Sequence, residues 1–143
     1  MFVQNKWGEV VNLDHVIAFK FFDDKAPYNL HLFTEKTETI FQFDSVEAIK
    51  AAINKITHKL MRQCLRWAEC NTKCQNWQFR SDKILSINDE CCRNLTVSMV
   101  GREFHVYTGA NTDEELWNCK KQITESLSED PFNSGIVMFD VLN

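Results

Sequence analysis

The stretch from Tyr28 to Val100 contains neither glycine nor proline. Because these two residues are the strongest breakers of regular structure, the stretch should consist almost entirely of strands and helices joined by short turns. The whole chain has 143 residues, of which 44% are hydrophobic and 12% aromatic, enough to fill a core. The sequence therefore predicts a single domain over residues 1–143 and excludes a disordered chain.

Alternation of apolar and polar residues predicts antiparallel strands in both halves of the chain. The alternation is clear in YNLHLF, where Leu30 and Leu32 share one face. Gly101 and Arg102 predict a tight hairpin, because glycine readily adopts positive φ. The predicted strands cover residues 10–22, 28–33, 39–43, 83–87, 95–100, 103–108 and 136–142.

Two capping-box sequences predict where helices begin. Asp44 is followed three residues later by Glu47, and Thr112 by Glu115. At this spacing, each side chain can accept a hydrogen bond from the backbone N–H of the other residue. The second helix should therefore run from Thr112 to about Ser128.

The apolar residues after Asp44 keep one helical phase for an unusually long way. At about 100° per residue they fall within an arc of roughly 140°. This predicts an unusually long first helix over residues 45–78, about 50 Å in length at ~1.5 Å per residue. A break near Thr57-His58 is the alternative. The residues on the arc are Ile49, Ala52, Ile53, Ile56, Leu60, Cys64, Trp67, Cys70, Cys74 and Trp77.

The two halves share this order of elements with nearly matched spacing, since Ser45 aligns with Thr112 and Ile49 with Leu116. The predicted fold class is α+β, with antiparallel β-meander units each followed by a helix. This ββα-type pseudo-repeat suggests half-repeats over residues 1–80 and 81–143. The pattern fits a duplication and fits two independent units equally well.

Cys64, Cys70 and Cys74 fall on the predicted apolar arc. Their C-x5-C-x3-C spacing differs from the C-x2-C pairs typical of zinc sites, and reduced cysteine is a good small core residue. We interpret them as packing residues and expect no metal and no cofactor. His31 and His105 lie within predicted strands, where solvent-facing histidines are more common than catalytic ones. Because the chain contains no nucleotide-binding or metalloprotease motif, we assign no catalytic residue.

Charge is unevenly distributed along the chain. Residues 45–80 contain seven basic and two acidic residues, a net charge of +5, which leaves −9 for the rest of a chain whose total is −4. On the predicted long helix, basic side chains form a stripe about 60° wide opposite the apolar arc. Like charges four residues apart repel, so the stripe suggests an anionic partner, although a solvated helix face is the simpler interpretation. The stripe comprises Lys55, Lys59, Arg62, Arg66 and Lys73.

The acidic residues Asp113, Glu114 and Glu115 begin the second predicted helix, where carboxylates are expected. They are also suited to bind a basic protein, such as a nuclease. The function that we predict is a non-catalytic protein that binds and blocks a macromolecular partner, like toxin-immunity proteins and phage-type anti-defence inhibitors. The partner-binding candidates are these three acids and the basic stripe. The alternatives are nucleic-acid or nucleotide binding through the stripe, and a small enzyme with a His/Cys site.

The first residues, MFVQNKWGEV, do not resemble a signal peptide. The chain also lacks the run of about 20 apolar residues that crosses a bilayer. We therefore expect a cytoplasmic protein without membrane contact. Another protein is the expected partner, nucleic acid is the alternative, and a homodimer would let the basic stripe meet the acidic half of a second copy.

Overall fold

The computed structural model describes residues 1–22, 24–61, 67–72 and 75–128. Within these residues, ten strands form three antiparallel sheets, in the spatial orders β5-β4-β3-β7-β6, β10-β9-β8 and β1-β2. The strands are β1 (Phe2–Gln4), β2 (Val10–Asn12), β3 (Ala18–Phe21), β4 (Tyr28–Phe33), β5 (Glu38–Phe43), β6 (Trp67–Asn71), β7 (Asn76–Arg80), β8 (Ile84–Glu90), β9 (Asn94–Met99) and β10 (Arg102–Val106).

Two α-helices, α1 (Val46–Met61) and α2 (Asp113–Ser128), each follow a run of three antiparallel strands. Short 3-10 turns, η1 (Leu13–His15), η2 (Ser81–Lys83) and η3 (Cys91–Arg93), connect strands. The predicted α+β class with antiparallel sheets is confirmed. The first predicted strand, 10–22, is divided by η1 into β2 and β3, and the predicted strand at 136–142 lies outside the described residues.

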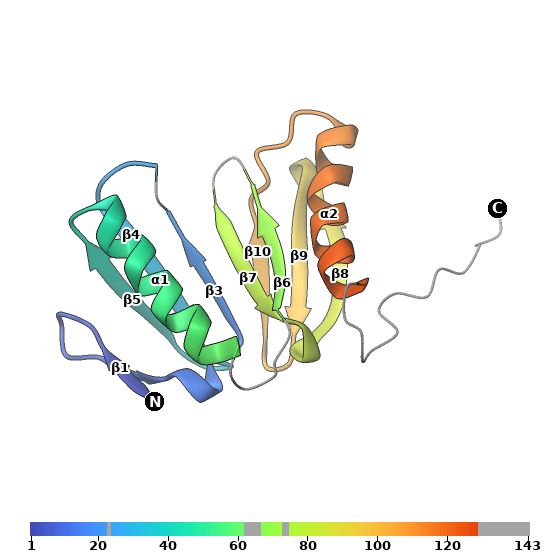
Figure 1. Ribbon diagram of the computed structural model, residues 1–143. Coiled ribbons are helices and arrows are strands. Elements are labelled where there is room, and N and C mark those ends of the chain that lie inside the picture. Colours follow the sequence, from blue (N-terminus) through green and yellow to red (C-terminus); the bar gives the residue numbers. More distant parts are fainter. Residues whose placement is uncertain (23, 62–66, 73–74, 129–143) are drawn as a thin grey trace.

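The five-stranded sheet lies between two cores, and α1 covers one of its faces (Figure 1). Fully buried Ile49 of α1 packs in one cluster with Leu30 and Leu32 of β4 and with Phe19 of β3. The predicted apolar arc is therefore correct for Ile49, Ile53 and Ile56, whose spacing of three or four residues places them on one face of α1.

The opposite face of the five-stranded sheet packs against the three-stranded sheet and α2. Aromatic rings dominate this contact: Phe104 of β10 lies 4.9 Å from Phe33 and 5.6 Å from Trp77, measured between ring centroids. Leu116 and Ile123 of α2 belong to the same core. This second core joins the earlier and later parts of the chain.

The predicted single helix over residues 45–78 is wrong from Trp67 onward, because β6 and β7 occupy residues 67–71 and 76–80. β7 pairs with β3 in antiparallel register, with Ala18 opposite Phe79. Burial then follows the alternation of a strand, since Trp77 and Phe79 are buried and Gln78 between them is not. The sheet pairing overrides the helical phase that these residues share with α1.

Both helix starts are capped by hydroxyl side chains. Ser45 Oγ accepts a hydrogen bond from the backbone N–H of Ala48 (3.1 Å), and Thr112 Oγ1 accepts one from the N–H of Glu115 (3.2 Å). The cap of α1 is therefore Ser45, one residue after the predicted Asp44. The prediction of Thr112 as the cap of α2 is correct.

Candidate partner-binding surface

The predicted basic stripe does not exist as one helix face. Lys55 and Lys59 lie on α1, with Lys55 exposed and Lys59 half-buried. Arg62, Arg66 and Lys73 lie outside the described residues. Because α1 ends at Met61 and β6 intervenes before position 73, a helical stripe that joins all five residues is wrong.

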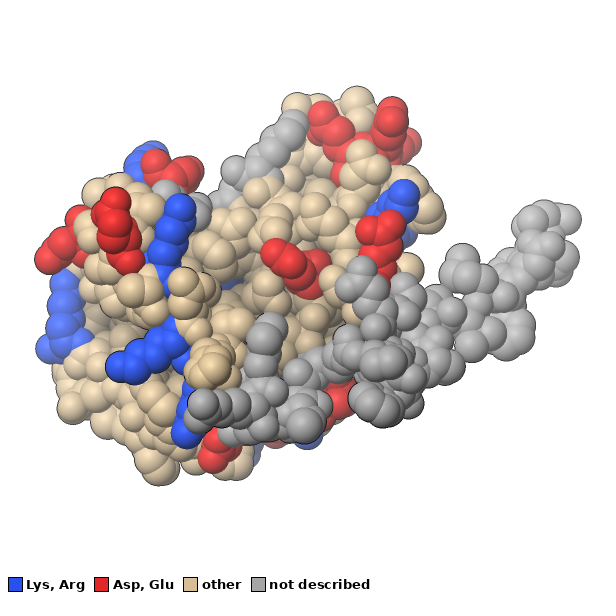
Figure 2. Space-filling model, in the orientation of Figure 1, with Lys and Arg blue, Asp and Glu red and all other residues tan. Residues whose placement is uncertain are grey.

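The acidic residues at the start of α2 have structural partners. The Asp113 side chain is 93% exposed, and its Oδ1 lies 3.1 Å from Arg93 Nε. Glu115 Oε2 accepts a hydrogen bond from the backbone N–H of Asn111 at 2.7 Å, and Glu114 is exposed. Figure 2 shows carboxylates at the beginnings of both helices, where they interact favourably with the helix dipole. Two of these acids therefore help to form the helix start.

Exposed apolar side chains gather at the N-terminus, a feature that our sequence analysis did not identify. Seven large hydrophobic residues are exposed in the described part of the chain, and four of them belong to the first ten residues. The other three lie in the second half of the chain and are Leu85, Tyr107 and Trp117. We call the four the apolar hairpin surface: Met1 (41% exposed), Phe2 (69%), Trp7 (57%) and Val10 (56%).

These residues lie on the hairpin formed by β1 and β2. Its turn is held by Asn5, which is only 8% exposed. Its Oδ1 accepts hydrogen bonds from the N–H groups of Trp7 (3.1 Å) and Glu9 (2.9 Å). Its Nδ2 donates to Ile40 O of β5 at 2.9 Å, which fixes the turn to the edge of the central sheet. Trp7 is therefore displayed by an ordered turn.

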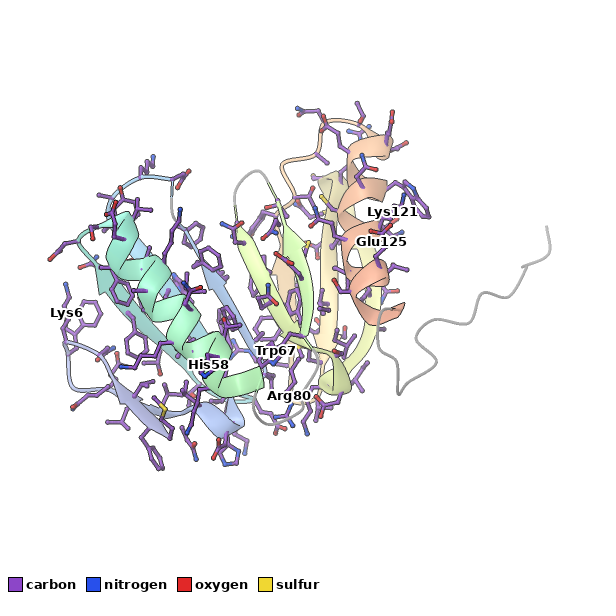
Figure 3. All side chains as sticks on the ribbon, viewed as in Figure 1. Lys6, His58, Trp67, Arg80, Lys121 and Glu125 are labelled. Atoms are coloured by element: carbon purple, nitrogen blue, oxygen red, sulfur yellow. The ribbon has the colours of Figure 1, made fainter. Side chains whose placement is uncertain are left out.

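A lysine accompanies the exposed tryptophan. Lys6 Nζ lies 4.7 Å from the Trp7 ring centroid and donates a hydrogen bond to Gln42 of β5. Figure 3 shows Lys6 at the edge of the molecule, beside the β1–β2 hairpin. A cation over an aromatic ring at an exposed site contributes about 0.5–1 kcal/mol, so the two side chains stabilise each other's orientation.

The two strand histidines each face a carboxylate. His31 Nδ1 lies 2.7 Å from Glu38 Oε1, and His105 Nδ1 lies 2.8 Å from Glu90 Oε2. The two pairs belong to different sheets, since β4 and β5 carry the first and β8 and β10 the second. Hydrogen bonds from Thr96 and His105 lower the pKa of the Glu90 carboxyl, so Glu90 is an anion over most of the pH range.

Cys70 lies in a strand and not on the predicted helix, which corrects the sequence interpretation for this residue. Cys70 is buried in β6, where burial, with smaller contributions from Cys119 and Glu69, raises the pKa of its thiol to about 12. Cys70 thus packs in the core, as a neutral thiol. Cys64 and Cys74 lie outside the described residues. Within the described ranges, no group of three or more His, Cys, Asp or Glu side chains is placed to hold a metal ion.

Neither described helix is long and apolar enough to cross a membrane. No protein family and no curated protein matches the chain. Among solved structures, it is similar to the LytTr DNA-binding domain of a methyl-accepting/DNA response regulator from Bacillus cereus, at 13% sequence identity and a TM-score of 0.43. The similarity covers 76% of this chain and 86% of that one. A likeness at this level assigns neither a family nor a function.

Proposed function

We propose that this protein is a non-catalytic binding protein that engages and blocks another protein through the apolar hairpin surface. Toxin-immunity proteins and phage-type anti-defence inhibitors are cytoplasmic proteins that block a partner without catalysis, and we place this chain in that functional class. The observation that carries the proposal is the gathering of Phe2, Trp7 and Val10 on one small hairpin. Single exposed hydrophobic residues are normal, but four large ones among the first ten residues are an unusual concentration of apolar surface, and exposed apolar surface of this kind is characteristic of interaction sites.

The composition of the surface fits a protein partner. Tryptophan is enriched among the residues that dominate binding energy, and phenylalanine is enriched at interfaces, because both bury a large apolar area. The ordered turn around Asn5 also lowers the entropy lost on binding. The hairpin is therefore a preorganised apolar anchor.

The basic side chains near this anchor suit carboxylates on the partner. Lys6 lies beside Trp7, and α1 carries Lys50, Lys55 and Lys59 against a single acid, Glu47. Figure 2 shows basic side chains along this half of the molecule. Complementary charges mainly increase the association rate and the specificity. We expect the partner to present an apolar pocket with carboxylates around it.

The test is native mass spectrometry of the protein purified gently from its own host. The variant Phe2→Ser/Trp7→Ser should lose the partner chain that the wild type retains. The matched control, Leu85→Ser/Trp117→Ser, also removes two exposed large side chains (68% and 58% exposed), and should retain it. Retention of the partner by the hairpin variant, or equal loss in the control, would contradict the proposal.

The same spectra separate the alternatives. A homodimer would appear as twice the chain mass. Nucleic-acid binding through Lys55 and Lys59 would give an association that weakens steeply with salt, and the variant Lys55→Glu/Lys59→Glu would abolish it. An enzyme that uses His31 or His105 with a cysteine would need a thiolate other than that of Cys70, because the raised pKa of Cys70 keeps its thiol protonated at neutral pH.

We also propose that the chain arose by duplication. The run η1-β3-β4-β5-α1 corresponds to η2-β8-β9-β10-α2, apart from the additional η3, and both helices have 16 residues. The β1–β2 pair precedes η1 as the β6–β7 pair precedes η2. The repeat boundary would then fall between α1 and β6, before the predicted boundary at residue 80.

A further inference from the structure

A pocket of about 410 Å³ lies where η1, η2 and the turn between β4 and β5 meet. This volume is within the range of small-molecule sites. The pocket shares Val10 with the apolar hairpin surface, and its other lining residues lie outside that surface. Ile17 and Val11, which are 2% and 4% exposed, give it an apolar base.

The two 3-10 turns supply corresponding positions to the pocket. Asn12 precedes η1 and His15 ends it, while Arg80 precedes η2 and Lys83 ends it, and all four side chains line the cavity. The third wall is the β4–β5 turn, which contributes Lys36. The pocket therefore draws its polar groups from both halves of the chain.

Backbone hydrogen bonds fix the walls relative to each other. The N–H of Arg80 donates to Ile17 O at 2.8 Å, and the N–H of Val100 donates to Lys83 O at 2.9 Å. Arg102 Nη1 donates to the carbonyl oxygens of Thr34 (3.3 Å) and Thr37 (3.2 Å), which anchors the β4–β5 turn. The cavity is thus a fixed feature of the fold.

Most of the charged residues in the lining are basic. Lys36, Arg80 and Lys83 are cations, and Glu35 is the one carboxylate among the lining residues. Arg80 is held by Asp82 through Nε–Oδ1 (2.8 Å) and Nη2–Oδ2 (3.2 Å), and its side chain is 16% exposed. This pair fixes the plane of the guanidinium and partly balances its charge. Figure 3 shows Arg80 at the end of β7, beside the junction of the two halves.

We infer that this pocket binds the phosphate group of a small phosphorylated molecule. A planar guanidinium held in place and two lysines are the groups that proteins use for phosphate. Asn12 and Thr37 add amide and hydroxyl donors at the wall. The volume exceeds that of a phosphate ion, so the apolar base formed by Ile17 and Val11 is available to the rest of the ligand.

The experiment is isothermal titration calorimetry of the full chain with ribose 5-phosphate and, separately, with inorganic pyrophosphate, at constant ionic strength. The variant Lys36→Gln/Lys83→Gln should weaken binding at least tenfold. Lys55→Gln/Lys59→Gln is the matched control, since each pair contains one exposed and one half-buried lysine. The control should change the affinity less than twofold.

Backbone amide chemical shifts provide a second readout that does not depend on the variants. Titration with either probe should shift the amide signals of His15, Lys36 and Lys83 and leave those of α2 unchanged. Binding of pyrophosphate but not of ribose 5-phosphate would overturn the assignment of a phosphorylated organic ligand. Absence of saturable binding of both probes, or equal weakening in the control, would overturn the site itself.

Discussion

Phe104 is the residue through which the two sheets depend on each other most directly. It extends from β10 of the three-stranded sheet, is 3% exposed, and meets three rings of the five-stranded sheet. The ring-centroid distances are 4.9 Å to Phe33, 5.6 Å to Trp77 and 5.9 Å to Phe79. We predict that Phe104→Ala destabilises both sheets together.

The magnitude follows from burial and packing. Replacing a buried phenylalanine by alanine costs about 3–5 kcal/mol in lost transfer energy and cavity formation. A small domain has a total stability of about 5–15 kcal/mol, so this loss is a large fraction of it. For a chain of this length the melting temperature should fall by about 10–15 °C. Trp117→Ala, at a side chain that is 58% exposed, should change stability by less than ~0.5 kcal/mol.

Urea denaturation gives the loss of free energy, and native-state hydrogen exchange shows where it occurs. If one cooperative unit is formed, the slowest amides of β4 and β9 should lose the same protection in Phe104→Ala. A loss below ~1 kcal/mol would refute the packing argument. Loss of protection in β9 alone would show that the sheets unfold separately, against the prediction of one domain over residues 1–143.

Three further predictions concern charge, thiols and backbone. The lowered pKa of Glu90 means that its stabilising contribution is fully present above the ordinary glutamate pKa and is lost as the pH falls through the lowered value. Thermal melts of Glu90→Gln should accordingly show a smaller decline in melting temperature on acidification from about pH 5 to pH 3 than the wild type, and an equal decline would contradict this. In the native protein at pH 8, a disulfide reagent should modify exposed Cys91 and Cys92 quickly and buried Cys70 only on unfolding, as peptide mass spectrometry can show. Gly101→Ala should lower the urea midpoint by the equivalent of about 1 kcal/mol or more, since φ is +93° and a Cβ would lie 2.8 Å from a side-chain carbon of the facing turn; an unchanged midpoint would refute the strain.

Strict alternation made the strands predictable. Residues 28–33 form β4 as predicted, and the hairpin at Gly101 joins β9 and β10 through a positive φ. The second helix is also correct, because Thr112 gives a clear cap and an apolar phase follows it. In each of these cases, the signal is contained within one element and its immediate neighbours.

Local sequence signals could not exclude the long first helix. Trp67, Cys70 and Trp77 are spaced by three and seven residues, which fits a helix face. In the strands, the odd spacing of Trp67 and Cys70 places them on opposite faces of the sheet, and both pack inward because each face is covered by a core. No glycine or proline marks the end of α1, and the signal that was present was weak: His58 and Lys59 in its last turn. The pairing of β7 with β3 decides the structure, and this contact joins residues far apart in the sequence.

The candidate surfaces were less predictable than the fold. In β1, Val3 packs inward and Phe2 points out, and only the position of the hairpin on the sheet decides which of them is buried. The pocket needs the two 3-10 turns to meet. The resemblance of NLDHVI to RSDKIL is the sequence signal for this, and its meaning becomes clear only when both segments line one cavity.

Helix α2 has a second role besides filling the core. Gln122 accepts a hydrogen bond from Asn71 N–H at 2.7 Å, and Ser126 accepts one from Glu69 N–H at 3.3 Å, so side chains occupy donors that an outer strand would otherwise offer to a neighbouring molecule. An unprotected edge of this kind is a template for fibril growth. Any treatment that detaches α2, such as proteolysis before Asp113, should therefore expose β6 and allow copies of the protein to assemble through it.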